Sequence, residues 1–272
     1  MSDWFSTLAA GNQLPVHAAS ELEERGFVVL PSMVATESLE RLTTAYTEAV
    51  TSATGDDIRV GSTSTKVSDF VNRGAAFDNL YVFPPLLEAC CQVIGGPFKL
   101  SSFHARTLRP GAHAQELHVD VPRNSADWPL LGFILMVDDF RPDNGTTRFV
   151  PGSHRWLATP EDTMSDVRAA HEAEVLACGA AGSLLVFNGS AWHSHTANTS
   201  NRPRRSIQGA FIPRGGRAAT DFAARMQPET RARLSSLAHS VLALPAVQRS
   251  AAADERQRVR PHPNMLEISD ER

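Results

Sequence analysis

The sequence has few cysteines and no long apolar run. Its 272 residues include three cysteines, of which Cys90 and Cys91 are adjacent and Cys178 lies far along the chain. Because adjacent cysteines rarely pair with each other, we expect no disulfide and a reducing, cytoplasmic location. No stretch approaches the length of a membrane span, and the N-terminus lacks the basic and apolar regions of a signal peptide. The sequence therefore predicts neither membrane insertion nor secretion.

The sequence also has little net charge. Its formal charge of −4 gives no reason to expect nucleic acid or an anionic membrane as a partner. Arginines do gather over residues 202–217, but no aromatic side chains are interleaved with them. Such a cluster matches an anionic small molecule better than a phosphate backbone. We therefore expect a small-molecule partner, and the sequence leaves the oligomeric state open.

The pattern of apolar residues changes at about residue 98. Before it, helical patterns dominate, and a stripe from Leu39 to Val50 predicts a helix with Thr36 as its N-cap. After it, short apolar runs alternate with turn clusters, which is typical of a β-sandwich or barrel. We expect one domain over 1–272, with an all-β core at about 98–214, flanking helices mainly from the N-terminal part (an α+β arrangement), and a C-terminal helix at about 228–244.

The segment ELHVD places His118 and Asp120 two residues apart, so on a strand both side chains face one way. A later histidine, His193 or His195, would complete a set of two imidazoles and one carboxylate. That set binds one face of an octahedral Fe(II) ion and leaves three positions open for a keto acid and O2. Arg204 follows these histidines, and its guanidinium suits the far carboxylate of such an acid. By itself, the His118–Asp120 pair would fit a solvated strand equally well.

Three segments in this order resemble one known family. They are HVD at 118–120, DNGTTRFVPGSHRW at 143–156 and WHSHTANTSNRPRRS at 192–206. Over roughly residues 20–214 the chain resembles the phytanoyl-CoA dioxygenase family of Fe(II)/2-oxoglutarate-dependent oxygenases. The resemblance implies a double-stranded β-helix (a cupin-like jelly roll), with Fe(II) as cofactor, 2-oxoglutarate as co-substrate, and O2.

The same resemblance assigns roles to individual residues. The implied metal ligands, which are also the catalytic residues, are His118, Asp120 and His193. His193 is favoured over His195 because the family pattern W-H-x-x-x-x-N fits Trp192, His193 and Asn198, and His195 would then line the pocket near the co-substrate. The implied co-substrate residues are Arg204, preferred to Arg205 by its spacing from His193, together with Thr147, Gln115 and Lys66. His154 is expected to close a turn, and His104 to be an ordinary strand residue.

The expected reaction is hydroxylation of an unactivated C–H bond of a small molecule. The resemblance extends to hydroxylases of natural-product biosynthesis, which points to secondary metabolism. The carboxylate at Asp120 argues against halogenation, because halogenating relatives have a small residue there. The loop after the HVD strand should carry substrate contacts or be plain surface, and its candidates are Arg123, Asn124 and Trp128. Epoxidation and desaturation remain open, as do a non-redox cupin-like isomerase or hydrolase and a metabolite-sensing protein.

Overall fold

The structure is a computed structural model in which residues 4–245 are described. Its α-helices are α1 (Trp4–Ala9), α2 (Val16–Arg25), α3 (Thr36–Thr51), α4 (Pro84–Ile94), α5 (Pro160–Thr163), α6 (Phe222–Arg225), α7 (Pro228–Arg233) and α8 (Ser236–Val241). Its strands are β1 (Phe27–Leu30), β2 (Ile58–Val60), β3 (Ser64–Val67), β4 (Phe98–Leu108), β5 (Leu131–Met136), β6 (Thr147–Phe149), β7 (Val175–Ala177), β8 (Leu184–Asn188), β9 (His193–His195) and β10 (Arg204–Pro213).

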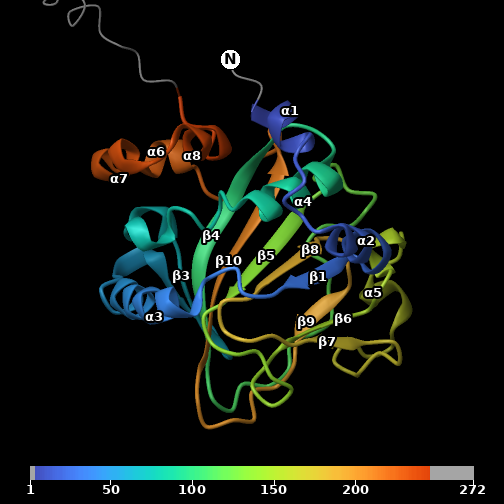
Figure 1. Ribbon diagram of the computed structural model, residues 1–272. Coiled ribbons are helices and arrows are strands. Elements are labelled where there is room, and N and C mark those ends of the chain that lie inside the picture. Colours follow the sequence, from blue (N-terminus) through green and yellow to red (C-terminus); the bar gives the residue numbers. More distant parts are fainter. Residues whose placement is uncertain (1–3, 246–272) are drawn as a thin grey trace, which may run out of the picture.

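The strands form two antiparallel sheets. A seven-stranded sheet has the order β1-β8-β5-β10-β4-β3-β2, and a three-stranded sheet has the order β7-β6-β9. Helices α2, α3, α4 and α8 contribute side chains to the core on one face of the large sheet (Figure 1). The small sheet packs against the other face. This is the predicted double-stranded β-helix, or jelly roll, with flanking helices.

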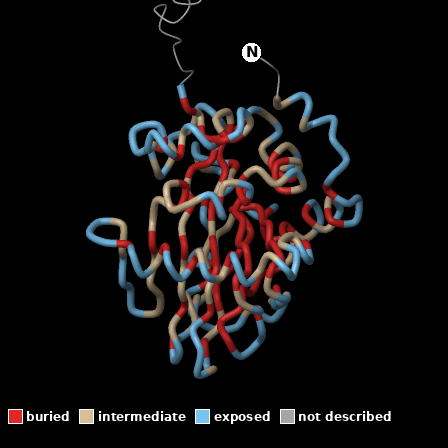
Figure 2. Tube along the Cα trace, turned by 60° about the vertical axis from the view of Figure 1, so that its left-hand side comes forward, coloured by how far each residue is buried: buried red, intermediate tan, exposed pale blue. Residues whose placement is uncertain are grey.

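Alternation along the central strands supplies both cores. In β5, Phe133 and Leu135 pack toward the helices, whereas Ile134 and Met136 pack toward the small sheet. Successive side chains of a strand point to opposite faces, so a strand covered on both sides must be apolar throughout. All six residues of β5 are buried, and Figure 2 shows buried chain running through the centre of the molecule. The centre of the large sheet is therefore enclosed on both faces.

Gly26 makes the turn from α2 into β1. It has φ of 84°, in the left-handed region, and its N–H donates to the carbonyl of Leu22 at 3.1 Å. A Cβ at this position would lie 2.5 Å from Nδ1 of His154, so there is no room for a side chain. His154 also approaches the Glu23 carbonyl through Nε2 at 3.0 Å. This contact fits the structural role expected for His154.

Three boundaries differ from the sequence predictions. Ala35, and not Thr36, is the N-cap of α3, with no side-chain capping hydrogen bond. The single C-terminal helix expected at 228–244 is wrong, because α7 ends before Leu234 and Ser235 starts α8 by accepting a hydrogen bond from Ala238 N–H. The large sheet also recruits β1, β2 and β3 from outside 98–214. These short strands form because they pair with other strands of the sheet. The assignment of 1–272 to one domain stays a prediction.

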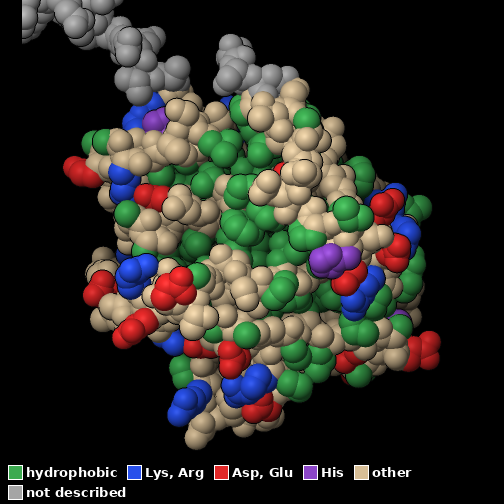
Figure 3. Space-filling model, in the orientation of Figure 1, with side chains coloured by type: hydrophobic (Ala, Val, Ile, Leu, Met, Phe, Trp, Pro, Cys, Tyr) green, Lys and Arg blue, Asp and Glu red, His purple; other side chains and the backbone are tan. Residues whose placement is uncertain are grey.

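No helix within residues 4–245 combines the length and apolarity needed to cross a membrane. Cys90, Cys91 and Cys178 are free thiols, and burial raises the pKa of Cys90. Figure 3 shows acidic and basic side chains interspersed on one face of the molecule. That face therefore offers no broad basic surface of the kind that binds nucleic acid.

Candidate metal centre

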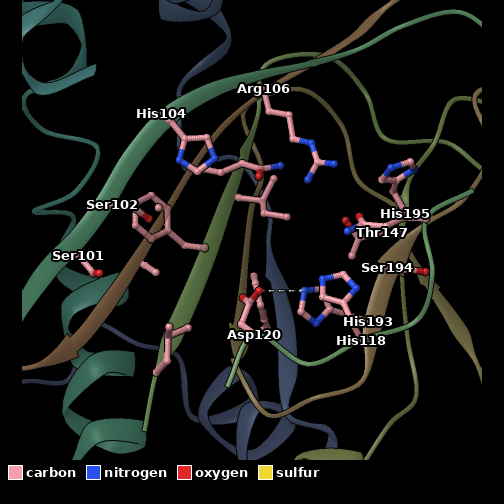
Figure 4. Close-up of a pocket in the computed structure, with 18 of the residues that line it drawn as sticks. Ser101, Ser102, His104, Arg106, His118, Asp120, Thr147, His193, Ser194 and His195 are labelled. Carbon is pink, nitrogen blue, oxygen red and sulfur yellow. Dashed lines mark ion pairs between the residues drawn. The ribbon is translucent and has the colours of Figure 1, made fainter. Parts of the chain in front are cut away.

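Two distant segments are joined by backbone hydrogen bonds at the candidate metal site. His118 N–H donates to the carbonyl of His193 at 3.0 Å, and His193 N–H donates to the carbonyl of His118 at 2.9 Å. Asp120 N–H donates to the carbonyl of Gly189 at 2.8 Å. One ligand atom from each of His118, Asp120 and His193 lies within 4.8 Å of the others. The structure therefore brings together the three side chains that the family resemblance implied (Figure 4).

Both imidazoles are oriented by backbone carbonyls. His118 Nδ1 lies 2.9 Å from the carbonyl of Glu116, and His193 Nδ1 lies 2.9 Å from that of Ala191. Because a carbonyl only accepts, each Nδ1 carries the hydrogen and each Nε2 keeps a free lone pair. Nε2 of His193 is 3.9 Å from Oδ1 of Asp120, and burial lowers the pKa of His193. Two imidazoles and one carboxylate fit a divalent ion such as Fe(II).

His195 lies on the same face of β9 as His193 but outside the group of three. Ser194 between them points away and accepts a hydrogen bond from Nε of Arg148 at 2.6 Å. His195 Nδ1 lies 2.9 Å from the carbonyl of Thr196, while its buried Nε2 has no hydrogen-bond partner. Burial is the main cause that lowers the pKa of His195 to about 4, so its ring is neutral. It lines the same cavity.

Two alanine variants separate the roles of these histidines. His193→Ala should lose iron binding and turnover together, because it removes an imidazole that faces Asp120. His195→Ala should keep the metal and lose roughly 10- to 100-fold in rate or co-substrate affinity, as expected of a neighbour of the metal site. Iron content and succinate release measure the two effects. Iron loss in His195→Ala with normal iron in His193→Ala would move the ligand to His195.

Arg204 is a buried cation without an anionic partner. Its residue is 2% exposed, its guanidinium carbon lies 4.2 Å from the ring centre of Phe140, and its Nε has no hydrogen-bond partner. Among the described side chains, no carboxylate forms an ion pair with it. Burial lowers its pKa to about 9, which leaves it charged at neutral pH. A buried guanidinium in this state is costly unless an anion joins it.

Arg205, the competing candidate, points to the other face of β10. It forms a fork with Asp138, with Nη2–Oδ1 at 2.6 Å and Nε–Oδ2 at 3.0 Å. Its charge is already balanced, whereas that of Arg204 is not. Arg204, which the spacing from His193 also favours, is therefore the better candidate for binding an anion.

A cavity of about 390 Å³ joins the metal-binding group to Arg204. Gln115 and Thr147, two of the candidate co-substrate residues, line it. Lys66 does not; it lines an adjoining cavity of about 350 Å³. The residues that the two cavities share are Ser102, His104 and Ala219.

The three loop residues proposed for substrate contact differ in whether they line a cavity. Trp128 lines a third cavity, of about 820 Å³, which shares Asp120 and Leu130 with the central one. Arg123 lies over the ring of Trp128 at 5.8 Å and donates to the carbonyl of His154 at 3.4 Å. Neither Arg123 nor Asn124 is among the lining residues of these cavities. Trp128 is thus the one of the three that the structure places beside the metal-binding group.

Further polar residues, not expected from the sequence, line the cavity. Ser102, His104 and Arg106 alternate with Phe103 and Ala105 along β4 and line the central cavity. Gln208 of β10 joins them. His104, expected as an ordinary strand residue, is held neutral because burial lowers its pKa to about 3. The sequence signal that could have identified them is the alternation of polar and apolar residues along β4, with a period of two.

Comparisons with known proteins identify the family of the chain. The family model described as phytanoyl-CoA dioxygenase matches residues 22–206. "Dioxygenase af480" of Aspergillus fumigatus is 26% identical over 243 residues, which cover 84% of this chain and 76% of that protein. "Dioxygenase trt7" of Aspergillus terreus is 27% identical over 221 residues, 73% of each chain.

Solved structures share the fold. HygX from Streptomyces hygroscopicus, crystallised with nickel, 2-oxoglutarate and hygromycin B, superposes with a TM-score of 0.63 at 13% identity, over 75% of this chain and 90% of HygX. SnoN, a non-heme α-ketoglutarate-dependent epimerase from nogalamycin biosynthesis, gives 0.61 at 18% identity, over 72% of this chain and 82% of SnoN. The chain belongs to the phytanoyl-CoA dioxygenase family and is a 2-oxoglutarate-dependent dioxygenase that uses iron.

Proposed function

We propose that this dioxygenase hydroxylates an unactivated C–H bond of a small organic molecule, with His118, Asp120 and His193 as its iron ligands. The observation that carries the proposal is the position of the buried, unpaired Arg204 in the same cavity as these three side chains. A metal-binding group alone would suit many metalloenzymes. Its combination with an unsatisfied cation suits an enzyme whose co-substrate is a chelating acid with a second carboxylate.

Each residue of the cavity has a definite task in this proposal. His118 and His193 present Nε2 to the metal, and Asp120 supplies the one anionic ligand. Arg204 binds the distal carboxylate of 2-oxoglutarate, and Thr147 and Gln115 offer a hydroxyl and an amide to the same molecule. The bound iron supplies the centre at which 2-oxoglutarate and O2 react.

Apolar side chains complete the cavity and exclude water. These include Leu130, Ile134 and Phe187. Exclusion of water strengthens the polar contacts within the site and protects reactive species from side reactions. The chain therefore contributes orientation and a dry environment, while the metal contributes the redox chemistry.

The solved structures support a small-molecule substrate and leave the outcome of the reaction to experiment. HygX was crystallised with nickel, 2-oxoglutarate and hygromycin B bound. SnoN is an epimerase, and SnoK, similar at a TM-score of 0.62 and 18% identity, is a carbocyclase. We therefore propose secondary metabolism as the setting, and hydroxylation as the outcome that product analysis must test.

The proposal is tested by titrating 2-oxoglutarate into the iron-loaded chain without oxygen. We expect one equivalent to bind and to produce the visible metal-to-ligand charge-transfer band. In air, succinate should form, and a turned-over substrate should gain one oxygen atom by mass spectrometry. Absence of both calorimetric binding and the band would reject the iron and 2-oxoglutarate site. A product that has gained no oxygen atom would reject hydroxylation but would leave the iron and 2-oxoglutarate site standing.

A further inference from the structure

Three positively charged residues stand side by side across the outer strands of the large sheet. Arg59 of β2 is the cross-strand partner of Lys66 of β3, and Lys66 is the partner of Arg106 of β4. Residues directly opposite on neighbouring strands project from the same face, where like charges destabilise the sheet. This row of cations, Arg59–Lys66–Arg106, therefore costs stability in the free protein.

The nearby acids do not neutralise this row. Within residues 4–245, no carboxylate forms an ion pair with any of its three members, and the side chain of Arg106 makes one hydrogen bond, from Nε to Oγ of Ser64 at 3.3 Å. Asp57 is engaged by Arg73 at 2.8 Å and by Arg225. The acids that line the adjoining cavity are Asp69, which pairs with Arg225 at 3.7 Å, Asp221, which caps α6, and the exposed Asp56.

Arg106 brings the charge of this row into the active-site cavity. It lines the cavity together with Arg204, and Asp120 is the one carboxylate among the lining residues. Figure 4 shows its guanidinium pointing toward the centre of the cavity, between His104 and His195. Burial lowers the pKa of both Arg106 and Lys66, and the charge of Asp120 only partly opposes this shift at Arg106.

The charges of the loaded site leave Arg106 unbalanced. On the proposed function, on which this step rests, iron and Arg204 are balanced by Asp120 and the two carboxylates of 2-oxoglutarate. Arg106 then remains as a charge of the cavity lining without a counter-charge. A cation enclosed in this way is stabilised when a bound ligand brings an anion with it.

A second unsatisfied group lies beside Arg106. His104, two residues earlier on the same face of β4, is partly buried, and its buried Nδ1 has no hydrogen-bond partner. It lies where the central cavity meets the adjoining one lined by Lys66 and Arg59. His104 thus lies at the boundary of the two cavities, one lined by Arg106 and the other by Arg59 and Lys66.

We propose that Arg106, with Lys66 beside it, binds an acidic group of the substrate, so that the substrate of this dioxygenase is a small-molecule carboxylate. The single negative charge of a carboxylate would balance the positive charge of Arg106 in the cavity loaded with iron and 2-oxoglutarate. The planar fork of Arg106 suits two carboxylate oxygens, and His104 and Gln208 provide further hydrogen-bonding groups. Lys66 accordingly serves the substrate, and not 2-oxoglutarate as the family resemblance implied.

The test uses matched pairs of ligands that differ in one charge. The full-length chain is loaded with nickel(II) and 2-oxoglutarate, which prevents turnover. Phenylacetate, cinnamate and octanoate, each beside its own primary amide, are then titrated by calorimetry. We expect at least one acid to bind roughly 10- to 100-fold more tightly than its amide, the range for a hydrogen bond to a charged group.

Arg106→Gln should abolish this preference for the acid. Its 2-oxoglutarate affinity should change by less than about threefold, since Arg204 holds that molecule and a more distant charge has a small effect. Arg106→Lys should recover part of the preference. Lys99→Gln is the matched control, because it removes one positive charge from the same strand outside the cavity lining and should keep the preference. Circular dichroism confirms that each variant is folded.

Three results would overturn this proposal. Acids and amides could bind wild type alike, or the preference could survive in Arg106→Gln. A loss of 2-oxoglutarate affinity of about 100-fold in Arg106→Gln, as large as expected for a direct carboxylate contact, would assign Arg106 to the co-substrate. In each case wild type still binds 2-oxoglutarate. Failure of wild type to bind it would instead reject the proposed function.

Discussion

Replacement of Asp120 by alanine is expected to abolish iron binding and turnover together. Asp120 is the one carboxylate lining a cavity that also holds two arginines. Without it, a divalent cation would face two imidazoles and uncompensated positive charge. Loss of residues that merely support ligands costs about 10- to 100-fold in metal affinity, so loss of a ligand should exceed 100-fold. Metal content after dialysis and anaerobic Fe(II) titration measure the change.

Asp127→Ala is the control for this variant. Asp127 is an exposed carboxylate of the loop that follows Asp120, and it is not among the residues lining the central cavity. Its removal changes the net charge equally and should leave iron stoichiometry unchanged. Normal iron binding by Asp120→Ala would contradict the ligand assignment.

Replacement of Arg204 by alanine should raise the 2-oxoglutarate binding constant by about two to three orders of magnitude. A buried charge that loses its partner costs about 3–5 kcal/mol, and each 1.4 kcal/mol is tenfold. Metal affinity should barely change, because Arg204 is not among the metal-binding side chains. Arg204→Lys should recover little, since an ammonium group cannot reproduce the planar fork. Titration of the charge-transfer band at saturating Fe(II) gives the constant.

Arg205→Ala provides the matched control on the next residue. It removes the same charge from the same strand, but on the face where Asp138 binds it. We expect a modest loss of thermal stability, since this pair is about a quarter exposed, and an unchanged 2-oxoglutarate constant. An Arg204→Ala constant close to wild type, or equal effects of the two variants, would contradict the assignment of Arg204.

Much of the local structure could be predicted from the sequence. Gly26 between a helical and a strand pattern marked the end of α2, and the apolar stripe of α3 marked its buried face. These features depend on neighbours within a few residues, so periodicity and turn chemistry determine them. The spaced family segments likewise identified the three metal-binding side chains and Arg204 as candidates.

Only the tertiary structure decided which of these residues meet. The mutual hydrogen bonds of His118 and His193 join segments that are remote in the sequence. Arg204 and Arg205 project from opposite faces of β10, and the packing of the sheet places Arg204 in the cavity and Arg205 beside Asp138. The row formed by Arg59, Lys66 and Arg106 was invisible in the sequence. Alternation gives the face of a strand, but the register between strands depends on hydrogen bonds across the sheet, so no local pattern places three separate cations side by side.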